Sequence, residues 1–347
     1  MIDKFDMKFI RSAVKNTLSV FVRFSNIDSL INISGCRLIL PFYHTVSDEN
    51  PVHIKHLYPI VCVRQFEEGL DFYQKHYSAL SHTEILNTVR DKQAVNKNAF
   101  FLSFDDGLRE FYDVAAPILL KRGIPATIFV NSAFVDNKDM FFRLKVSILM
   151  ERIEQKGLSP GQKKAMTEVF AKNNLNYTSA LDVLKITDKN KDLPDDIAPI
   201  LDVDFSAYLS EKKPYLTTGQ LKELAEKGFS IGSHSVSHPF YPNLSEDDQI
   251  TQTVDCLHFL SKNLDVKDRL FAFPYTDTGV QQSFFERIKT EVDLSFGTAG
   301  LKIDPVDFHF QRIPMEMGDC CAKKIIKTEY LYFILKRLIG KHKISRH

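Results

Sequence analysis

The stretch FFLSFDDGLREFYDVAAPILLKRGIPATIFVN, residues 100–131, predicts a strand, a helix and a second strand in succession. Mostly apolar runs at Phe100–Phe104 and Ala126–Asn131 predict the strands, and apolar residues at helical spacing over Phe111–Arg122 predict the helix. Gly123 follows directly, which is typical of the residue after a helix C-terminus. A strand, a helix and a strand at this spacing indicate a βαβ unit and therefore a parallel sheet.

The same alternation continues on both sides of this unit. Further strands are predicted at Leu38–His44, Phe229–Gly232, Leu270–Phe273, Leu294–Thr298 and Phe308–Ile313. Further helices are predicted at Val63–Tyr77, Thr218–Lys227, Ser245–Asn263 and Val280–Lys289. Residues 140–213 interrupt the pattern with helical segments rich in Lys, Glu and Asn. We therefore expect an α/β barrel made of residues 37–139 and 214–316, with a helical insertion at 140–213.

The overall composition excludes several classes of protein. The 347 residues are 44% hydrophobic and 26% charged, as in an ordinary globular protein, and a net charge of +1 argues against a nucleic-acid-binding protein. Five cysteines without a CxxC spacing indicate reduced thiols rather than disulfides or a cysteine zinc site. Because the sequence shows neither an 18-residue apolar run nor a secretory signal pattern, we expect a cytoplasmic protein.

The charge is unevenly distributed along the chain. Residues 321–347 hold eight Lys or Arg and one Glu, and residues 1–36 hold five basic and three acidic side chains. Amphipathic basic helices are predicted over residues 9–23 and over Cys320–Lys341, within terminal segments 1–36 and 317–347. Such helices favour a peripheral contact with the anionic inner face of a membrane. Docking of both helices on the barrel, with solvated basic faces, explains the pattern equally well.

Two adjacent carboxylates, Asp105 and Asp106, follow the strand of the opening stretch. The C-terminal edge of a parallel strand is where α/β proteins build their sites. Two other Asp-Asp pairs, at 195–196 and 247–248, lie in a polar loop and in the first turn of a helix, where solvation or the helix dipole explains them. Only Asp105 and Asp106 follow a buried strand, where two neighbouring negative charges are costly unless a cation or a function stabilises them.

A second strand ends in FSIGSHSVSHP, residues 229–239, with His234 and His238 four positions apart. Two imidazoles and one carboxylate form a sound zinc ligand set with positions left for water and substrate. The alternative is that one histidine caps the next helix and the other is a satisfied core residue. Two more strand ends carry Tyr275, in LFAFPYTDTG (residues 270–279), and His44, in LPFYHTVSD (residues 40–48).

In this order, SFDDG, HSVSHP and FAFPYTDTG resemble the motifs of the metal-dependent polysaccharide deacetylases, carbohydrate esterase family 4 with the NodB homology domain. The resemblance covers about Leu38–Val135 and Leu216–Pro314. It implies an irregular (β/α)7 barrel with its site at the C-terminal ends of the strands. It also implies a hydrolase that removes an acetyl group from an N-acetylated sugar in a polysaccharide or a saccharide precursor.

The resemblance also implies a role for each motif residue. Asp106, His234 and His238 would bind a divalent metal ion, usually zinc, and Asp105 would be the general base. Metal and base together would deprotonate a bound water that attacks the acetamide carbonyl. The metal and the backbone N–H of Tyr275 would stabilise the developing oxyanion.

The sequence departs from the common family pattern at the general acid and at the base-orienting arginine. Typical members carry the acid in a late Leu-x-His, which is not visible here, and the nearest late candidate is His309. A subgroup that acts on exopolysaccharides has this histidine in an N-terminal strand, which Pro41–His44 resembles, so we predict His44. Ala272 stands where many members have the arginine, and Arg312 is predicted to supply that charge.

Two other functions remain open. The first is a metal-dependent hydrolase of another amide on the same barrel, and the second is a non-catalytic glycan-binding relative. Intact Asp105, Asp106, His234 and His238 argue against the second. A cytoplasmic location would favour a lipid-linked or nucleotide-linked saccharide precursor as the substrate over a secreted polymer.

Overall fold

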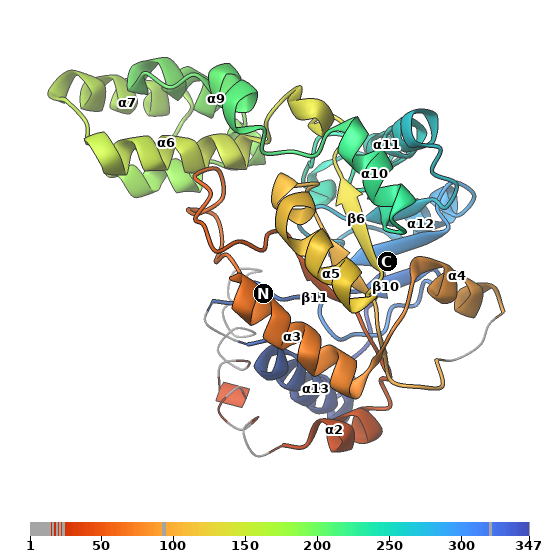
Figure 1. The fold of residues 1–347 in the computed structure, drawn as a ribbon. Coiled ribbons are helices and arrows are strands. Elements are labelled where there is room, and N and C mark those ends of the chain that lie inside the picture. The colour runs from red at the N-terminus through yellow and green to blue at the C-terminus, as the bar shows by residue number, and fades with distance from the viewer. Residues whose placement is uncertain are drawn as a thin grey trace.

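The centre of the protein, in this computed structural model, is a sheet of eight parallel strands (Figure 1). In sheet order they are β10 (His309–Gln311), β9 (Leu294–Gly297), β8 (Leu270–Ala272), β7 (Ser230–Ser233), β6 (Ala126–Val130), β5 (Leu102–Phe104), β2 (Pro41–Tyr43) and β11 (Ile313–Pro314). The two edge strands of this sheet, β10 and β11, are separated along the chain by Arg312 alone. The two edges therefore meet, and the sheet closes into a barrel. The predicted α/β barrel is confirmed.

The structure describes residues 25–91, 95–318 and 321–346, together with residues 15, 17, 18, 20 and 22. The helix predicted over residues 9–23 therefore lies largely outside the described residues. None of the helices within the described ranges combines the length and the apolar character that crossing a membrane requires. The membrane contact of the terminal segments stays a prediction.

Three predicted strands are each divided in two. The strand predicted at Leu38–His44 is β1 (Leu38–Ile39) followed by β2, and the one at Phe100–Phe104 is β4 (Ala99–Phe100) followed by β5. Their first halves form a small parallel sheet with β3 (Ser78–Ala79), in the order β1-β4-β3. The strand predicted at Phe308–Ile313 is divided because β10 pairs with β9 whereas β11 pairs with β2.

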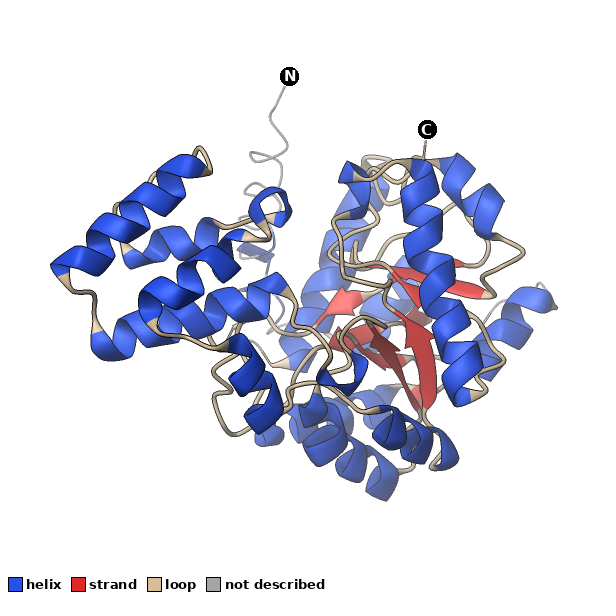
Figure 2. Ribbon diagram, turned by 90° about the horizontal axis from the view of Figure 1, so that it is seen from above, coloured by secondary structure: helices blue, strands red, loops and turns tan. Residues whose placement is uncertain are grey.

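Helices surround the barrel (Figure 2). They are α3 (Val63–His76), α4 (His82–Arg90), α5 (Ala116–Arg122), α10 (Thr218–Glu226), α11 (Glu246–Leu264) and α12 (Gln282–Ile288). The predicted helix at Phe111–Arg122 begins with a π-helical turn, η2 (Phe111–Ala115), before α5. Pro117 explains the irregular start, since it lacks an N–H and its ring clashes with the carbonyl four residues earlier.

Side chains alternate between the two faces of each barrel strand. Leu102 and Phe104 pack outward in the main hydrophobic cluster against the helices, whereas Phe101 belongs to a cluster inside the barrel. Inside, the rings of Phe101 and Phe296 stack with their centroids 5.1 Å apart. The same alternation directs Ser103 and Asp105 inward, which prepares the position of the first carboxylate.

The predicted insertion is a helical body to one side of the barrel (Figures 1 and 2). It contains α6 (Phe142–Lys156), α7 (Pro160–Lys172), α8 (Leu193–Ile197) and α9 (Phe205–Lys212), with short 3₁₀ turns η4 (Ala180–Lys185), η5 (Asp188–Asn190) and η6 (Ala198–Leu201). A separate hydrophobic cluster holds these helices together and includes Leu108 and Tyr215 from the barrel side. The two ends of the insertion lie next to each other. There the Asn137 side chain donates a hydrogen bond to the Tyr215 carbonyl and accepts one from the Tyr215 N–H.

The last predicted helix is shorter than expected. The C-terminal helix α13 runs over Ala322–Leu338 and packs against α3 and against α2 (Ile27–Ser34), which the sequence did not predict. Cys320, where the prediction began, lies outside the described residues. Lys327 and Glu329 are buried on α13, so its charges are not all on a solvated face. Beyond it, Lys343 forms a parallel bridge with Ile303.

Candidate metal and catalytic site

The two neighbouring carboxylates at the end of β5 point in different directions because the backbone turns between them. The Asp105 N–H still donates to the Tyr43 carbonyl at 2.9 Å, as in the strand. Asp106 and Gly107 then adopt φ angles of 69° and 62°, in the left-handed region. Glycine is needed at the second position, since a Cβ there would lie 2.8 Å from Val130 Cγ1.

Asp106 lies between the two histidines that follow β7. Its Oδ1 is 3.5 Å from His234 Nε2 and 3.2 Å from His238 Nε2. That oxygen is buried and has no hydrogen-bond partner among the described residues. His238 has a φ of 57°, in the left-handed region. Left-handed backbone at non-glycine residues costs free energy and is frequent at functional sites.

A backbone carbonyl fixes the orientation of His234. Its Nδ1 lies 2.8 Å from the carbonyl oxygen of Ala272, which can only accept a hydrogen bond, so Nδ1 carries the proton and Nε2 is free to bind a metal. Burial lowers the pKa of His234 to about 4, which keeps the ring neutral at neutral pH.

These three atoms fit a divalent metal ion. Tetrahedral zinc with ligands at about 2.0–2.1 Å places neighbouring ligand atoms about 3.3 Å apart. The two separations from Asp106 Oδ1 match that value. Burial alone would raise the pKa of Asp106, but the nearby His238 and His44 outweigh it and hold this pKa below its usual range. The group therefore offers one carboxylate and two imidazoles, and the buried carboxylate oxygen has no hydrogen-bond partner within the described part of the chain.

Arg312 binds Asp105 inside the barrel. Its Nη1 and Nη2 lie 2.6 and 2.8 Å from the two carboxylate oxygens, and Nη1 is also 3.1 Å from Ser103 Oγ. The guanidinium lies between the rings of Phe42 and Phe129, at 4.3 and 5.2 Å from their centroids. Burial would raise the pKa of Asp105, but the Arg312 guanidinium outweighs burial and holds this pKa below its ordinary value, so the carboxyl stays ionised.

His44 lies at the end of β2 and is paired with a carboxylate that sequence analysis did not single out. Glu316 follows β11, accepts hydrogen bonds from the N–H groups of His44 and Thr45 at 2.7 and 2.9 Å, and contacts His44 Nδ1. Burial alone would lower the pKa of His44, but the Glu316 carboxylate outweighs it and raises this pKa to about 10. The sequence signal that could have identified Glu316 is its position just after a barrel strand, which is also the position of Asp105.

Tyr275 follows β8 and closes the site on the side of the insertion. Its φ is 55°, and none of the described residues accepts a hydrogen bond from its backbone N–H. Its ring centroid lies 4.6 Å from that of His238. Phe141, which precedes α6, packs on His238 with ring centroids 4.4 Å apart, so the first residues of the insertion contact the candidate metal ligands Asp106, His234 and His238 at His238.

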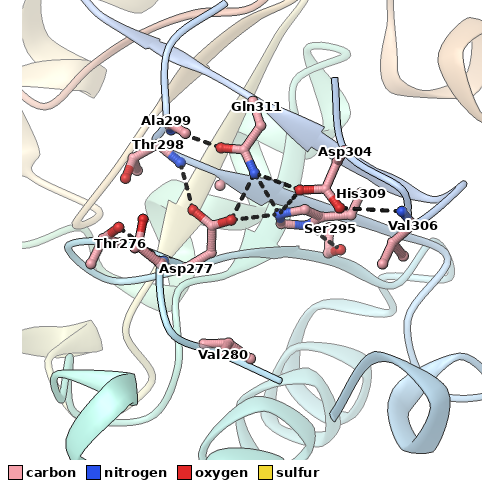
Figure 3. Close-up of polar contacts among 12 residues, drawn as sticks. Thr276, Asp277, Val280, Ser295, Thr298, Ala299, Asp304, Val306, His309 and Gln311 are labelled. Carbon is pink, nitrogen blue, oxygen red and sulfur yellow. Dashed lines mark hydrogen bonds and ion pairs between the residues drawn. The ribbon is translucent and has the colours of Figure 1, made fainter. Parts of the chain in front are cut away.

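His309, the second candidate for the general acid, lies in a different buried cluster (Figure 3). Its Nδ1 is 2.7 Å from Ser295 Oγ and its Nε2 is 3.2 Å from Asp277 Oδ2. Both of its ring nitrogens are thus engaged away from Asp105. The ligand atoms of Asp277, Asp304 and His309 are also close enough together to hold a metal ion. Arg346 Nη2, however, already lies 2.6 Å from both carboxylates and balances their charge in place of a metal.

The first comparison with known proteins matches residues 92–284 to a family model described as polysaccharide deacetylase. This range includes Asp105, Asp106, His234, His238 and Tyr275 and excludes His44, Arg312 and Glu316. No curated protein matches the chain.

Solved structures with a similar fold come from several bacteria. The Streptococcus pyogenes deacetylase PplD in complex with acetate is 19% identical, with a TM-score of 0.52, covering 85% of this chain and 98% of that one. IcaB from Ammonifex degensii is 17% identical, with a TM-score of 0.52, covering 84% and 97%. A de-N-acetylase from Aggregatibacter actinomycetemcomitans is 16% identical, with a TM-score of 0.52, covering 84% and 100%. At these identities the likeness shows a shared fold.

Proposed function

The chain belongs to the polysaccharide deacetylase family and is a carbohydrate de-N-acetylase, and on that premise we propose a mechanism that depends on a divalent metal and on Asp105 as the base. The observation that carries the proposal is the buried Oδ1 of Asp106, which lies between two histidine Nε2 atoms and has no hydrogen-bond partner among the described residues. A buried carboxylate oxygen without a partner is costly unless a cation binds it. Zinc suits this set of one oxygen and two nitrogen ligands best.

Asp106, His234 and His238 would hold the ion. When bound, a divalent metal polarises a water molecule and the substrate carbonyl, and this is the chemistry it supplies here. The Ala272 carbonyl keeps His234 Nε2 unprotonated for this purpose. Phe141 and Tyr275 pack on the His238 ring and limit the access of bulk water to that ligand.

Asp105 would accept the proton of the attacking water. Arg312 keeps this carboxylate ionised and holds it by two hydrogen bonds, so its orientation is set before substrate arrives. Each carboxylate oxygen retains a further lone pair to accept a proton from water. The backbone N–H of Tyr275, which no described residue engages, would donate to the oxygen of the tetrahedral intermediate.

His44 would protonate the leaving amine. Glu316 holds the ring at Nδ1 and favours the imidazolium, which leaves Nε2 as the proton donor. Proton transfer by a positioned group of this kind contributes about 10²–10⁴-fold to a rate. The N-acetyl group of a sugar provides what these residues require, an amide carbonyl and an amine leaving group, and an N-acetylated saccharide is therefore the proposed substrate.

Replacing Glu316 by Gln tests the role of His44. Without the carboxylate, burial dominates and the pKa of His44 falls from about 10 toward or below its ordinary value. Because the acid must be protonated, we expect the alkaline limb of the kcat/KM profile to move down by at least about one pH unit. Glu286→Gln, at an exposed position on α12, is the matched control. An unchanged profile in Glu316→Gln would exclude His44 as the acid.

The metal requirement is tested by removing and restoring the ion. We expect the stripped protein to release no acetate from N-acetylglucosamine oligosaccharides, and added Zn²⁺ or Co²⁺ to restore activity by about 100-fold or more. Wild type should bind one Zn²⁺ per chain, and His238→Ala should lose it, because the three ligands act together. His258→Ala, at an exposed position on α11, should keep the metal. Full activity of the stripped protein would overturn the proposal.

A further inference from the structure

A cavity of about 470 Å³ lies between the insertion and the barrel, beside the candidate site. Phe142, Arg143 and residues 186–189 of the insertion form one wall, and Phe240, Asn243 and Tyr275 of the barrel loops form the other. Its volume lies in the range of pockets that bind small organic ligands, about 300–1,000 Å³. Of the residues that line it, the proposed mechanism uses only Tyr275.

Tyr275 joins the cavity to the candidate site. One part of its ring faces His238, at 4.6 Å between centroids, and Phe240 lies 5.9 Å away on the cavity side. Burial raises the pKa of the Tyr275 phenol, and the charges of Arg143, Asp106 and Asp188 also act on it. A ligand in the cavity would therefore lie next to the substrate group that reacts beside Asp106.

The insertion wall is held in place by hydrogen bonds of its own. Arg143 Nη1 donates to the carbonyls of Leu184 and Ile186 at 2.9 and 3.0 Å, which ties α6 to the segment that enters η5. Ile186 is buried and fixes the segment from beneath, whereas Thr187 and Asp188 follow it at the cavity. The wall thus exists before a ligand arrives, which lowers the entropic cost of binding.

The lining of the cavity fits a sugar ring. The aromatic side chains of Phe142, Phe240 and Tyr275 offer apolar faces for the C–H side of a pyranose. Asp188, Asn243 and Thr187 offer acceptors and donors for its hydroxyl groups. An acyl chain would leave these polar groups without partners, and the lining carries charges of both signs, Arg143 and Lys189 with Asp188, to which hydroxyl groups can both donate and accept.

We propose that this cavity is a subsite for the sugar residue next to the one that loses its acetyl group, so that the insertion makes the enzyme selective for a glycan chain. The proposal rests on the proposed function. It predicts that the enzyme distinguishes an oligosaccharide from a single sugar through Asp188 on the insertion and Phe240 on the barrel. Tyr275 contacts both residues of the glycan.

The test compares N-acetylglucosamine tetrasaccharide with the monosaccharide. We expect Phe240→Ala to lower kcat/KM for the tetrasaccharide about 10-fold and Asp188→Ala about 5-fold, each relative to the value for the monosaccharide. Asp202→Ala, on the same insertion with its side chain 82% exposed and outside the cavity, is the matched control and should leave the ratio unchanged. Equal losses for both substrates, or no loss, would overturn the subsite.

Binding to the metal-stripped protein separates this proposal from the proposed function. Calorimetric titration should show the tetrasaccharide bound more tightly than the monosaccharide, with the difference reduced about 5- to 10-fold in the two variants. If zinc-loaded wild type releases no acetate but this binding pattern holds, the deacetylase mechanism fails and the subsite stands. If acetate is released and the variants bind both sugars as wild type does, only the subsite fails.

Discussion

Asp105→Asn is expected to lower kcat by about 10³-fold while the protein still binds one Zn²⁺. The amide cannot accept the proton of the attacking water, and loss of a positioned general base costs about 10²–10⁴ in rate. Metal binding should persist, because Asp106, His234 and His238 are the proposed ligands. The measurements are acetate release from an N-acetylglucosamine oligosaccharide and metal content, made on the same preparation.

The matched control is Asp195→Asn. Asp195 also belongs to an Asp-Asp pair, but it lies in the insertion with its side chain 51% exposed and paired to Lys145. Its replacement should change kcat by less than about 2-fold, as expected for a surface ion pair. Since Asp105→Asn also removes a charge next to Arg312, its circular dichroism must match wild type for the comparison to count. Activity within 10-fold of wild type in a folded, zinc-loaded Asp105→Asn would exclude Asp105 as the base.

Arg312→Met is expected to lower the free energy of unfolding by about 3–5 kcal/mol, the usual cost of removing one partner of a buried ion pair. Arg312 and Asp105 have side-chain exposures of 0% and 2%, so Asp105 would be left as an uncompensated charge inside the barrel. Urea unfolding followed by circular dichroism measures the change. Arg269→Met is the control, because the Arg269–Asp293 pair has a 41% exposed arginine and should be worth less than about 1 kcal/mol.

The cost of Arg312→Met should depend on pH in a definite direction. Arg312 lowers the pKa of Asp105 in the folded state. The stabilisation from this pair is therefore present above the unfolded pKa of about 3.9 and is lost as the pH falls through the lower folded value. In Arg312→Met, burial raises the pKa of Asp105 instead, so acid favours its neutral form. The stability gap between wild type and variant should narrow from pH 7 to pH 4, and a gap that widens would contradict this account.

The barrel was predictable from the sequence because patterns among neighbouring residues indicate its strands and helices. Apolar runs, helical spacing and Gly123 after α5 predict a βαβ unit in residues 100–131 whatever the rest of the chain does. The division of strands at Leu40, Phe101 and Arg312 was not predictable, because each division marks a change of neighbouring strand. The π-helical turn before α5 had a local signal, Pro117, which lies inside the predicted helix.

The sequence predicted the partner of Asp105 but not the partner of His44. Arg312 was predicted to supply charge to the base, and in the structure it contacts both oxygens of Asp105. Glu316 was missed, although it contacts His44 at both the backbone N–H and Nδ1 and also accepts a hydrogen bond from the Thr45 N–H. His309 was the alternative acid, and in the structure its two ring nitrogens lie within hydrogen-bond distance of Ser295 and Asp277.

The sequence by itself determined that a parallel barrel forms and that Asp105, Asp106, His234 and His238 lie at the ends of its strands. Tertiary structure alone decided which of these groups meet. Closure of the barrel through β10 and β11 brings Arg312 to Asp105 and Glu316 to His44, more than 200 residues away in each case. It also sets the insertion beside Tyr275. The physical reason is that strand pattern is a property of neighbouring residues, whereas ion pairs, pKa values and cavities depend on distances that only the closed sheet sets.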